Sequence, residues 1–178
     1  MLEPTDLMLA LCIVVVASAL QSAVGFGLGL IAAPFLLMID ARLIPGPLVL
    51  ASLVLTALTA YRDRAHIDLQ GMGAALLGRA LGTIPAAIFM ALTSSLFFDV
   101  AFGGMVMVAA LLSGAGLHFT ATKTSAFIAG GASGLMGTIS SIGGPPMALI
   151  YQNSKSQTMR GTLAGYFAAG TVFTLLAL

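Results

Sequence analysis

SSIGGPP, residues 140–146, interrupts a long apolar region near the C-terminal end of a 178-residue chain. Its two prolines lack backbone N–H donors, and the two glycines before them readily adopt non-helical dihedral angles. In hydrocarbon, such a break is tolerated only where the backbone is buried in protein or lines a wet cavity. The stretch therefore predicts a broken helix inside a membrane protein.

A second break lies near the N-terminal end and reads GFGLG, residues 25–29, followed by Pro34. Each break adjoins a short apolar piece, residues 28–39 in the first case and 145–152 in the second. A helix needs about 20 apolar residues to cross a bilayer, so neither piece crosses alone. We expect two re-entrant half-helices.

The composition supports a membrane location. Hydrophobic residues make up 59% of the chain and charged residues only 7%, and the mean hydropathy is +1.08. Such a composition excludes a water-soluble globular protein. The net charge of +1 without a basic run excludes a nucleic-acid partner. One cysteine, Cys12, and two distant histidines, His66 and His118, give no disulfide and no metal-ligand spacing, so no cofactor is expected.

The hydropathy pattern predicts an all-α membrane protein, an inverted-repeat bundle of about six spanning helices plus the two half-helices. The lipid bilayer is its first partner. The predicted spans are residues 7–24, 46–61, 69–91, 96–112, 123–142 and 160–178.

Basic residues set the orientation. The loop at residues 62–66 is the most basic of the chain, and cytoplasmic loops are enriched in Lys and Arg. If both half-helices turn back, the N-terminus lies outside and only Arg42 falls outside among the basic loop residues. Full crossing by each short piece, the alternative, scatters the charges between the two sides. The basic residues then placed inside are Arg62, Arg64, Lys123, Lys155 and Arg160.

The two broken regions repeat with opposite orientation. Gly143 follows Gly29 by 114 residues, and under this topology the first break enters from outside and the second from inside. Residues 1–178 then form a single integral membrane domain. The first repeat with its connecting helix spans residues 7–112, and a second, apparently truncated inverted repeat spans residues 123–178.

Broken helices at matching places in two inverted halves indicate the substrate site of a transporter. The N-terminus of a half-helix offers free N–H groups and the positive end of the helix dipole, which suits an anion. For Ser140 and Ser141, hydrogen bonding of the hydroxyls to nearby backbone carbonyls is an equal alternative to binding an anion. The candidate substrate-binding residues at the breaks are Gly25, Phe26, Gly27, Gly29, Ser140, Ser141, Gly143, Gly144, Pro145 and Pro146.

Glycines spaced four residues apart have a simpler explanation than substrate binding. Pairs four residues apart let membrane helices approach closely. For any one such pair, packing is the preferred interpretation. The pairs with this spacing are Gly25 and Gly29, Gly78 and Gly82, Gly130 and Gly134, and Gly161 and Gly165.

Arg79 is the most informative charge. If Asp68 caps its helix, Arg79 lies about 16 Å deep, where a lone guanidinium is costly and should face the protein interior or a cavity. We expect substrate contact, with carbonyls or a carboxylate such as Asp99 as the alternative partner. Gln21 and Arg160 are candidate pathway residues, for which the alternatives are an interhelical hydrogen bond and interfacial snorkelling.

The breaks resemble a known family. A glycine-rich first break ending in a proline, the second break SIGGPP, and the later stretch MRGTLA at residues 159–164 are similar to the sulfite exporter TauE/SafE family of membrane permeases. The resemblance runs over nearly the whole chain. It implies transport of sulfur-containing anions or organosulfonates, such as sulfite, thiosulfate, sulfoacetate or taurine-derived products, across the bacterial inner membrane.

The leading interpretation is a secondary permease for a small anion, working by alternating access around a midplane site and driven by a coupling ion. An anion channel is the main alternative. An intramembrane enzyme is a weaker one, because no nucleophile and base pattern is evident.

The repeat offset places the counterpart of the 69–91 helix at about residues 182–205. We therefore expect missing C-terminal helices or a homo-oligomer to cover a second break otherwise exposed to lipid.

Overall fold

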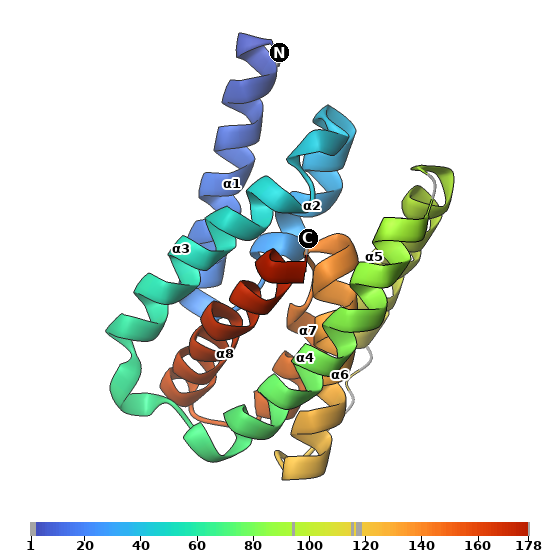
Figure 1. Ribbon diagram of the computed structural model, residues 1–178. Coiled ribbons are helices and arrows are strands. Elements are labelled where there is room, and N and C mark those ends of the chain that lie inside the picture. The colour runs from blue at the N-terminus through green and yellow to red at the C-terminus, as the bar shows by residue number, and fades with distance from the viewer. Residues whose placement is uncertain (1–2, 94, 115, 117–118, 178) are drawn as a thin grey trace.

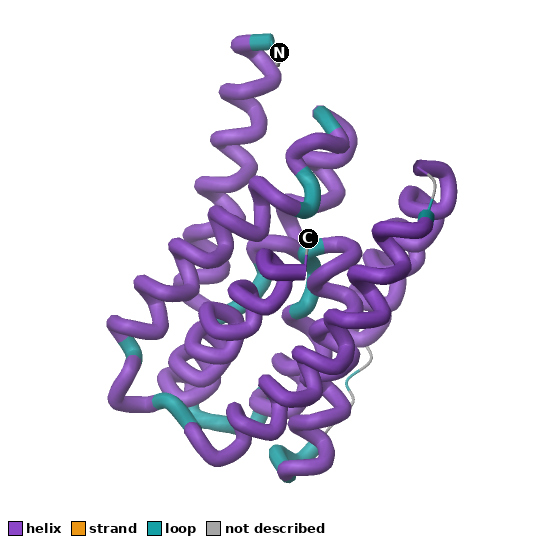
Figure 2. The backbone as a smooth tube through the Cα atoms, viewed as in Figure 1, coloured by secondary structure: helices purple, strands orange, loops and turns teal. Residues whose placement is uncertain are grey.

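The computed structural model describes residues 3–93, 95–114, 116 and 119–177. Within that part the chain is helical and contains no strand, which confirms the all-α prediction (Figures 1 and 2). His118 and the last residue of the predicted 160–178 span lie outside the described residues. The helices are α1 (Pro4–Val24), α2 (Leu28–Ile39), η1 (Ala41–Leu43), α3 (Gly46–Arg62), η2 (Arg64–His66), α4 (Leu69–Leu92), α5 (Ser95–Gly114), α6 (Lys123–Ser140), α7 (Gly144–Tyr151) and α8 (Ser156–Ala177).

Four helical segments among the described residues are long and apolar enough to cross a membrane: α1, η1 together with α3, α4, and most of α5. The protein is therefore a multi-pass membrane protein. The other two predicted spans correspond to α6 and α8, which are 18 and 22 residues long but richer in Gly, Ser and Thr. Many of their residues are buried against other helices, so they form the interior of the bundle.

The first break is confirmed as a helix interruption. Gly25 and Gly27 have φ angles of 100° and 125°, values that suit glycine and stop the helix. The N–H of Gly25 closes α1 on the Gln21 carbonyl at 2.7 Å, and the Gln21 side-chain oxygen accepts from the N–H of Leu28 at 2.8 Å. One residue thus ends α1 and caps α2.

The helix before the second break ends two residues earlier than predicted. The predicted helix 123–142 ends at Ser140 because Ser141 has a left-handed conformation, with φ of 61°. The hydroxyl of Ser133 donates to the Gly143 carbonyl at 2.6 Å, which ties the break back to α6. From Gly144 the chain continues as the short helix α7.

The two breaks meet inside the bundle. A side chain at Gly29 would overlap the carbonyl of Ser141, and a Cβ at Gly144 would lie 2.7 Å from the Phe26 ring. In Figure 1 the N-terminus and the far end of α2 lie at one end of the bundle, whereas α6 begins at the other. The two broken pairs, α1–α2 and α6–α7, therefore approach the same region from opposite ends.

Helices α4 and α6 pack with almost no space between their backbones. A side chain at Gly78 would overlap the carbonyl of Phe127, and one at Gly82 would overlap the carbonyl of Gly131. From the α6 side, Gly130 and Gly134 lie equally close to the α4 backbone. These are two of the predicted four-residue spacings, and close packing is their role.

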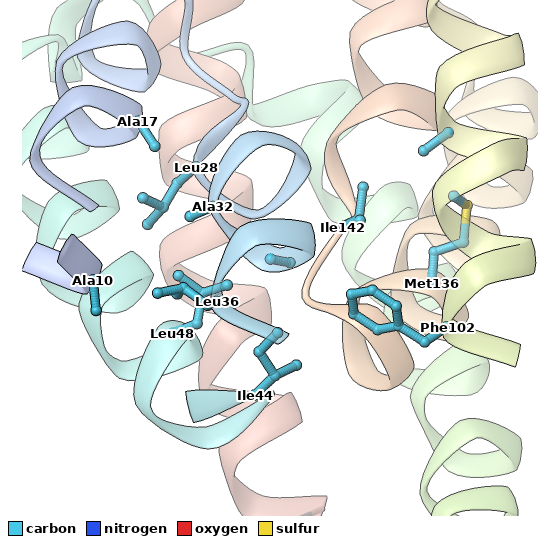
Figure 3. Close-up of a cluster of buried hydrophobic side chains, with 12 residues drawn as sticks. Ala10, Ala17, Leu28, Ala32, Leu36, Ile44, Leu48, Phe102, Met136 and Ile142 are labelled. Carbon is cyan, nitrogen blue, oxygen red and sulfur yellow. The ribbon is translucent and has the colours of Figure 1, made fainter. Parts of the chain in front are cut away.

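Two clusters of buried apolar side chains flank the breaks. The first surrounds α2 and reaches from Ala10 on α1 to Phe102 on α5 and Ile142 in the second break (Figure 3). The second joins α4, α6, α7 and α8 around Met147 and Tyr166. Both are rich in alanine, which lets the helices come close enough to enclose the polar groups between them.

The expected exposure of the second break to lipid is wrong. Pro145, Pro146 and Met147 are buried, because α5, α6 and α8 all contact α7. The break is enclosed by helices of the same chain.

Candidate anion site

A small cavity lies where the two breaks meet. Its volume is about 40 Å³, and a cavity of roughly 10–15 Å³ already holds one water molecule. The space therefore suits a few waters or a small ion. Its walls come from both broken regions and from α3, α4 and α8, and the lining residues are Gln21, Phe26, Gly27, Gly29, Leu30, Leu48, Val49, Ser52, Arg79, Gly137, Ser141, Ile142, Gly143, Gly144, Phe167 and Thr171.

Most of the candidate residues are brought together here. Candidates from α1, from the first break and the start of α2, from α4, and from the second break all line this one space. They are Gln21, Phe26, Gly27, Gly29, Arg79, Ser141, Gly143 and Gly144.

Within the described part of the chain, Arg79 is the only charged residue lining the cavity. Arg79 is 4% exposed. The two terminal nitrogens donate to the hydroxyls of Ser133 on α6 and Thr174 on α8, each at 3.3 Å. The guanidinium also lies 5.4 Å from the centre of the Tyr166 ring and 5.8 Å from that of Phe167. Its Nε is buried and has no hydrogen-bond partner among the described residues.

No carboxylate neutralises Arg79. All six acidic residues of the chain are in the described part, and none of them lines the cavity. Asp99, the alternative partner considered from the sequence, is exposed on α5 and forms no ion pair with Arg79. A buried, unpaired guanidinium is costly, and a bound anion would offset that cost.

Ser141 supplies a second free donor. Its hydroxyl is buried without a partner among the described residues, and the residue lines the same cavity. A non-glycine residue with φ of 61° is uncommon, and such strained positions concentrate at functional sites. Ser141 and Arg79 both line this cavity, and each has a buried donor without a partner among the described residues.

Four of the candidates at the breaks lie outside the cavity. Ser140 donates to the Met136 carbonyl at 2.8 Å, so the alternative of local bonding holds for it. Gly25 packs against Arg160, where a Cβ would lie 2.8 Å from the Cα atom. Pro145 and Pro146 are buried in the first turn of α7, where a missing N–H costs little.

Arg160 pairs with Asp63 instead of lining the cavity. Its Nε lies 2.5 Å from one carboxylate oxygen, and a terminal nitrogen lies 3.1 Å from the other. The adjacent Asp68 caps α4, accepts from the Tyr151 hydroxyl at 3.2 Å, and donates its N–H to Thr162 at 2.9 Å. This network connects the loop before α4 to α7 and α8.

Protonation of Asp63 gives a testable effect on stability. Hydrogen bonds from Arg160, with a further one from Arg62, lower the pKa of Asp63 to about 2. Because this pKa is below the unfolded value of about 3.9, the carboxylate stabilises the folded state above that value and ceases to do so as pH falls through about 2. We expect Asp63→Asn to lower the thermal unfolding midpoint in detergent by several degrees at about pH 5, and to flatten its fall at lower pH.

Asp40→Asn is the matched control. Its pKa is also lowered to about 2 by Arg42, but that partner is two residues away and 75% exposed. Such a local surface pair contributes little, so this variant should unfold like the wild type. Identical midpoints for wild type and Asp63→Asn across the pH range would contradict the role given to the Asp63–Arg160 pair.

Several residues of the site were not anticipated from the sequence. Ser133 and Thr174 hold the guanidinium, and Tyr166 and Phe167 face it. Gly170 leaves the room that the arginine side chain fills. A polar residue on a face of α8 that also carries aromatic residues could have indicated partners for the arginine. The sequence alone, however, does not show which face of α8 points inward.

Comparison with known proteins gives one family. Residues 9–178 match the family model described as sulfite exporter TauE/SafE. No curated protein matches the chain, and no solved structure does.

Proposed function

The chain belongs to the sulfite exporter TauE/SafE family, and on this premise we propose that it is a secondary transporter of small sulfur-containing anions, either oxyanions or organosulfonates. The substrate would bind in the cavity between the two breaks. One broken region would move against the other to open the cavity to each side in turn, as inverted-repeat transporters do. A coupling ion gradient would supply the driving force, and the expected location is a bacterial inner membrane.

The observation that carries this proposal is the state of Arg79. It is buried and has no carboxylate partner, and its Nε is unbonded among the described residues; Ser141, whose hydroxyl is also unbonded there, lines the same cavity. Buried charges in proteins are normally paired or hydrogen-bonded, and an anion would complete both residues. Charge-assisted bonds of this kind are about twice as strong as neutral ones.

Uptake into proteoliposomes tests the proposal. Labelled sulfite, thiosulfate and a two-carbon sulfonate would be compared with and without a pH gradient. A transporter gives saturable uptake that responds to the gradient, whereas an anion channel gives uptake that rises linearly with concentration. Absence of protein-dependent uptake for all three anions would refute the proposal.

Ser141 offers a further prediction. We expect Ser141→Gly to lower uptake by about fivefold to tenfold, because the variant loses one donor to the anion while glycine keeps the left-handed backbone. Ser140→Gly is the matched control, since Ser140 bonds to Met136 and does not line the cavity. Uptake by Ser141→Gly that equals the Ser140→Gly value would remove the hydroxyl from the site.

The orientation is tested by cysteine labelling. In a Cys12→Ser background, which removes the exposed native thiol, cysteines are placed at Ala65 and Asn153, both exposed at the predicted cytoplasmic ends. Both should be protected in intact cells from an impermeant thiol reagent. A cysteine at the exposed Ala41 near the other end should react. Labelling at Ala65 with protection at Ala41 would reverse the topology.

A further inference from the structure

We infer that the cavity selects anions by charge: it binds singly charged oxyanions and rejects doubly charged ones of the same size. This inference rests on the proposed function and specifies the substrate class of the same site. It follows from the number of charges that the cavity holds, from their surroundings, and from the lack of any group that could change that number.

The cavity holds one positive charge. Among the residues that the structure describes, only Arg79 is a charged lining residue, and no lysine, histidine or acidic residue joins it there. The groups packed against the guanidinium are neutral: hydroxyls of Ser133 and Thr174, and the faces of Tyr166 and Phe167. A bound monoanion therefore leaves the site neutral, whereas a dianion leaves one net negative charge.

The surroundings make that extra charge costly. Arg79 is 4% exposed, and apolar clusters lie on both sides of the breaks. An uncompensated charge in such a place carries a desolvation penalty that no contact returns. A completed guanidinium–anion pair, in contrast, recovers part of the cost of burying the two charges through their mutual attraction.

The half-helix ends do not provide a second unit charge. The N-terminus of α2 borders the cavity, but the first N–H of that helix already donates to Gln21. The first turn of α7 contains Pro145 and Pro146, which have no N–H to donate. Their dipoles add only partial charges that favour an anion of either class.

The charge of the site is fixed across ordinary pH. Arginine stays protonated in proteins. Among the described residues, the titratable group that faces it is the phenol of Tyr166 on α8, which donates to the Gly130 carbonyl at 3.4 Å. Since α4, α6, α8 and the two breaks bring no other titratable group to the cavity, the protonation state of the anion itself decides whether it binds.

Methanesulfonate and sulfate test this inference directly. The two anions have the same number of heavy atoms and the same tetrahedral sulfur, and they differ by one charge. Each would compete with labelled sulfite for uptake by the wild-type protein in proteoliposomes. We expect methanesulfonate to compete at least about tenfold more strongly than sulfate. Equal or stronger competition by sulfate would overturn the inference while leaving the transporter function intact.

A second measurement uses sulfite alone. As the pH rises through neutrality, sulfite loses its remaining proton, whereas methanesulfonate keeps a single negative charge throughout. With equal pH on both sides, uptake should fall in proportion to the singly charged form, and uptake of methanesulfonate should stay constant. Sulfite uptake that is constant or rises over this range would contradict the selection of monoanions. If neither anion is transported at any pH, the proposed function itself fails, and this inference with it.

Discussion

Arg79→Gln is expected to reduce saturable anion uptake by about two orders of magnitude, because it removes the one charge that a buried anion can pair with. Arg79→Lys should retain part of the activity. Lysine keeps the charge but loses the planar arrangement of donors that reaches Ser133 and Thr174 at the same time. Initial rates of labelled sulfite uptake in proteoliposomes, normalised to the reconstituted protein, measure both effects.

A control distinguishes loss of binding from loss of structure. Arg42→Gln removes an exposed arginine that is not among the lining residues of the cavity and should transport like the wild type. Size-exclusion profiles of both glutamine variants in detergent should match the wild-type profile. Wild-type uptake by Arg79→Gln would show that the guanidinium stabilises the bundle without contacting the anion.

The second large effect concerns stability. Gly82→Ala should destabilise the protein by about 2–3 kcal/mol, because the new methyl group would overlap the carbonyl of Gly131 and lie 2.9 Å from its carbon. Backbone atoms of two packed helices cannot move aside as a flexible side chain can. The thermal unfolding midpoint in detergent measures the change.

Gly73→Ala is its matched control on the same helix. A Cβ at Gly73 meets nothing within 4 Å, so this variant should be neutral or gain up to about 1 kcal/mol from alanine's higher helix propensity. Equal midpoints for Gly73→Ala and Gly82→Ala would mean that α4 and α6 are not in backbone contact there.

The breaks could be predicted because their causes are local. Glycines at positive φ and prolines without an N–H act on the residues beside them, so residues 25–29 and 140–146 indicate interruptions whatever surrounds them. The predicted half-helix 28–39 agrees with α2 at both ends. The burial of Arg79 followed from the cost of a charge at its depth, which needs no knowledge of its neighbours.

The partners of Arg79 could not be predicted in this way. Ser133 and Thr174 lie 54 and 95 residues further along the chain. They are on helices whose apolar residues are spread around every face, so periodicity does not show which face points inward. The ion pair of Asp63 could not be predicted for another reason. Asp63 lies between Arg62 and Arg64, so the sequence of this loop indicates only a basic segment. Its partner Arg160 is 97 residues away.

The packing of Arg79 against Gly170 has a consequence for how an anion would be recognised. A Cβ at Gly170 would overlap Cδ and Nε of the arginine, so the aliphatic part of the side chain lies directly on the α8 backbone. A free arginine has about 2 kcal/mol of rotamer entropy to lose, and here folding has already removed it. The guanidinium is preorganised, and binding would not have to order it. Among anions of equal charge, discrimination then depends on where the anion's atoms fall relative to a rigid donor, which favours ligands that match its geometry.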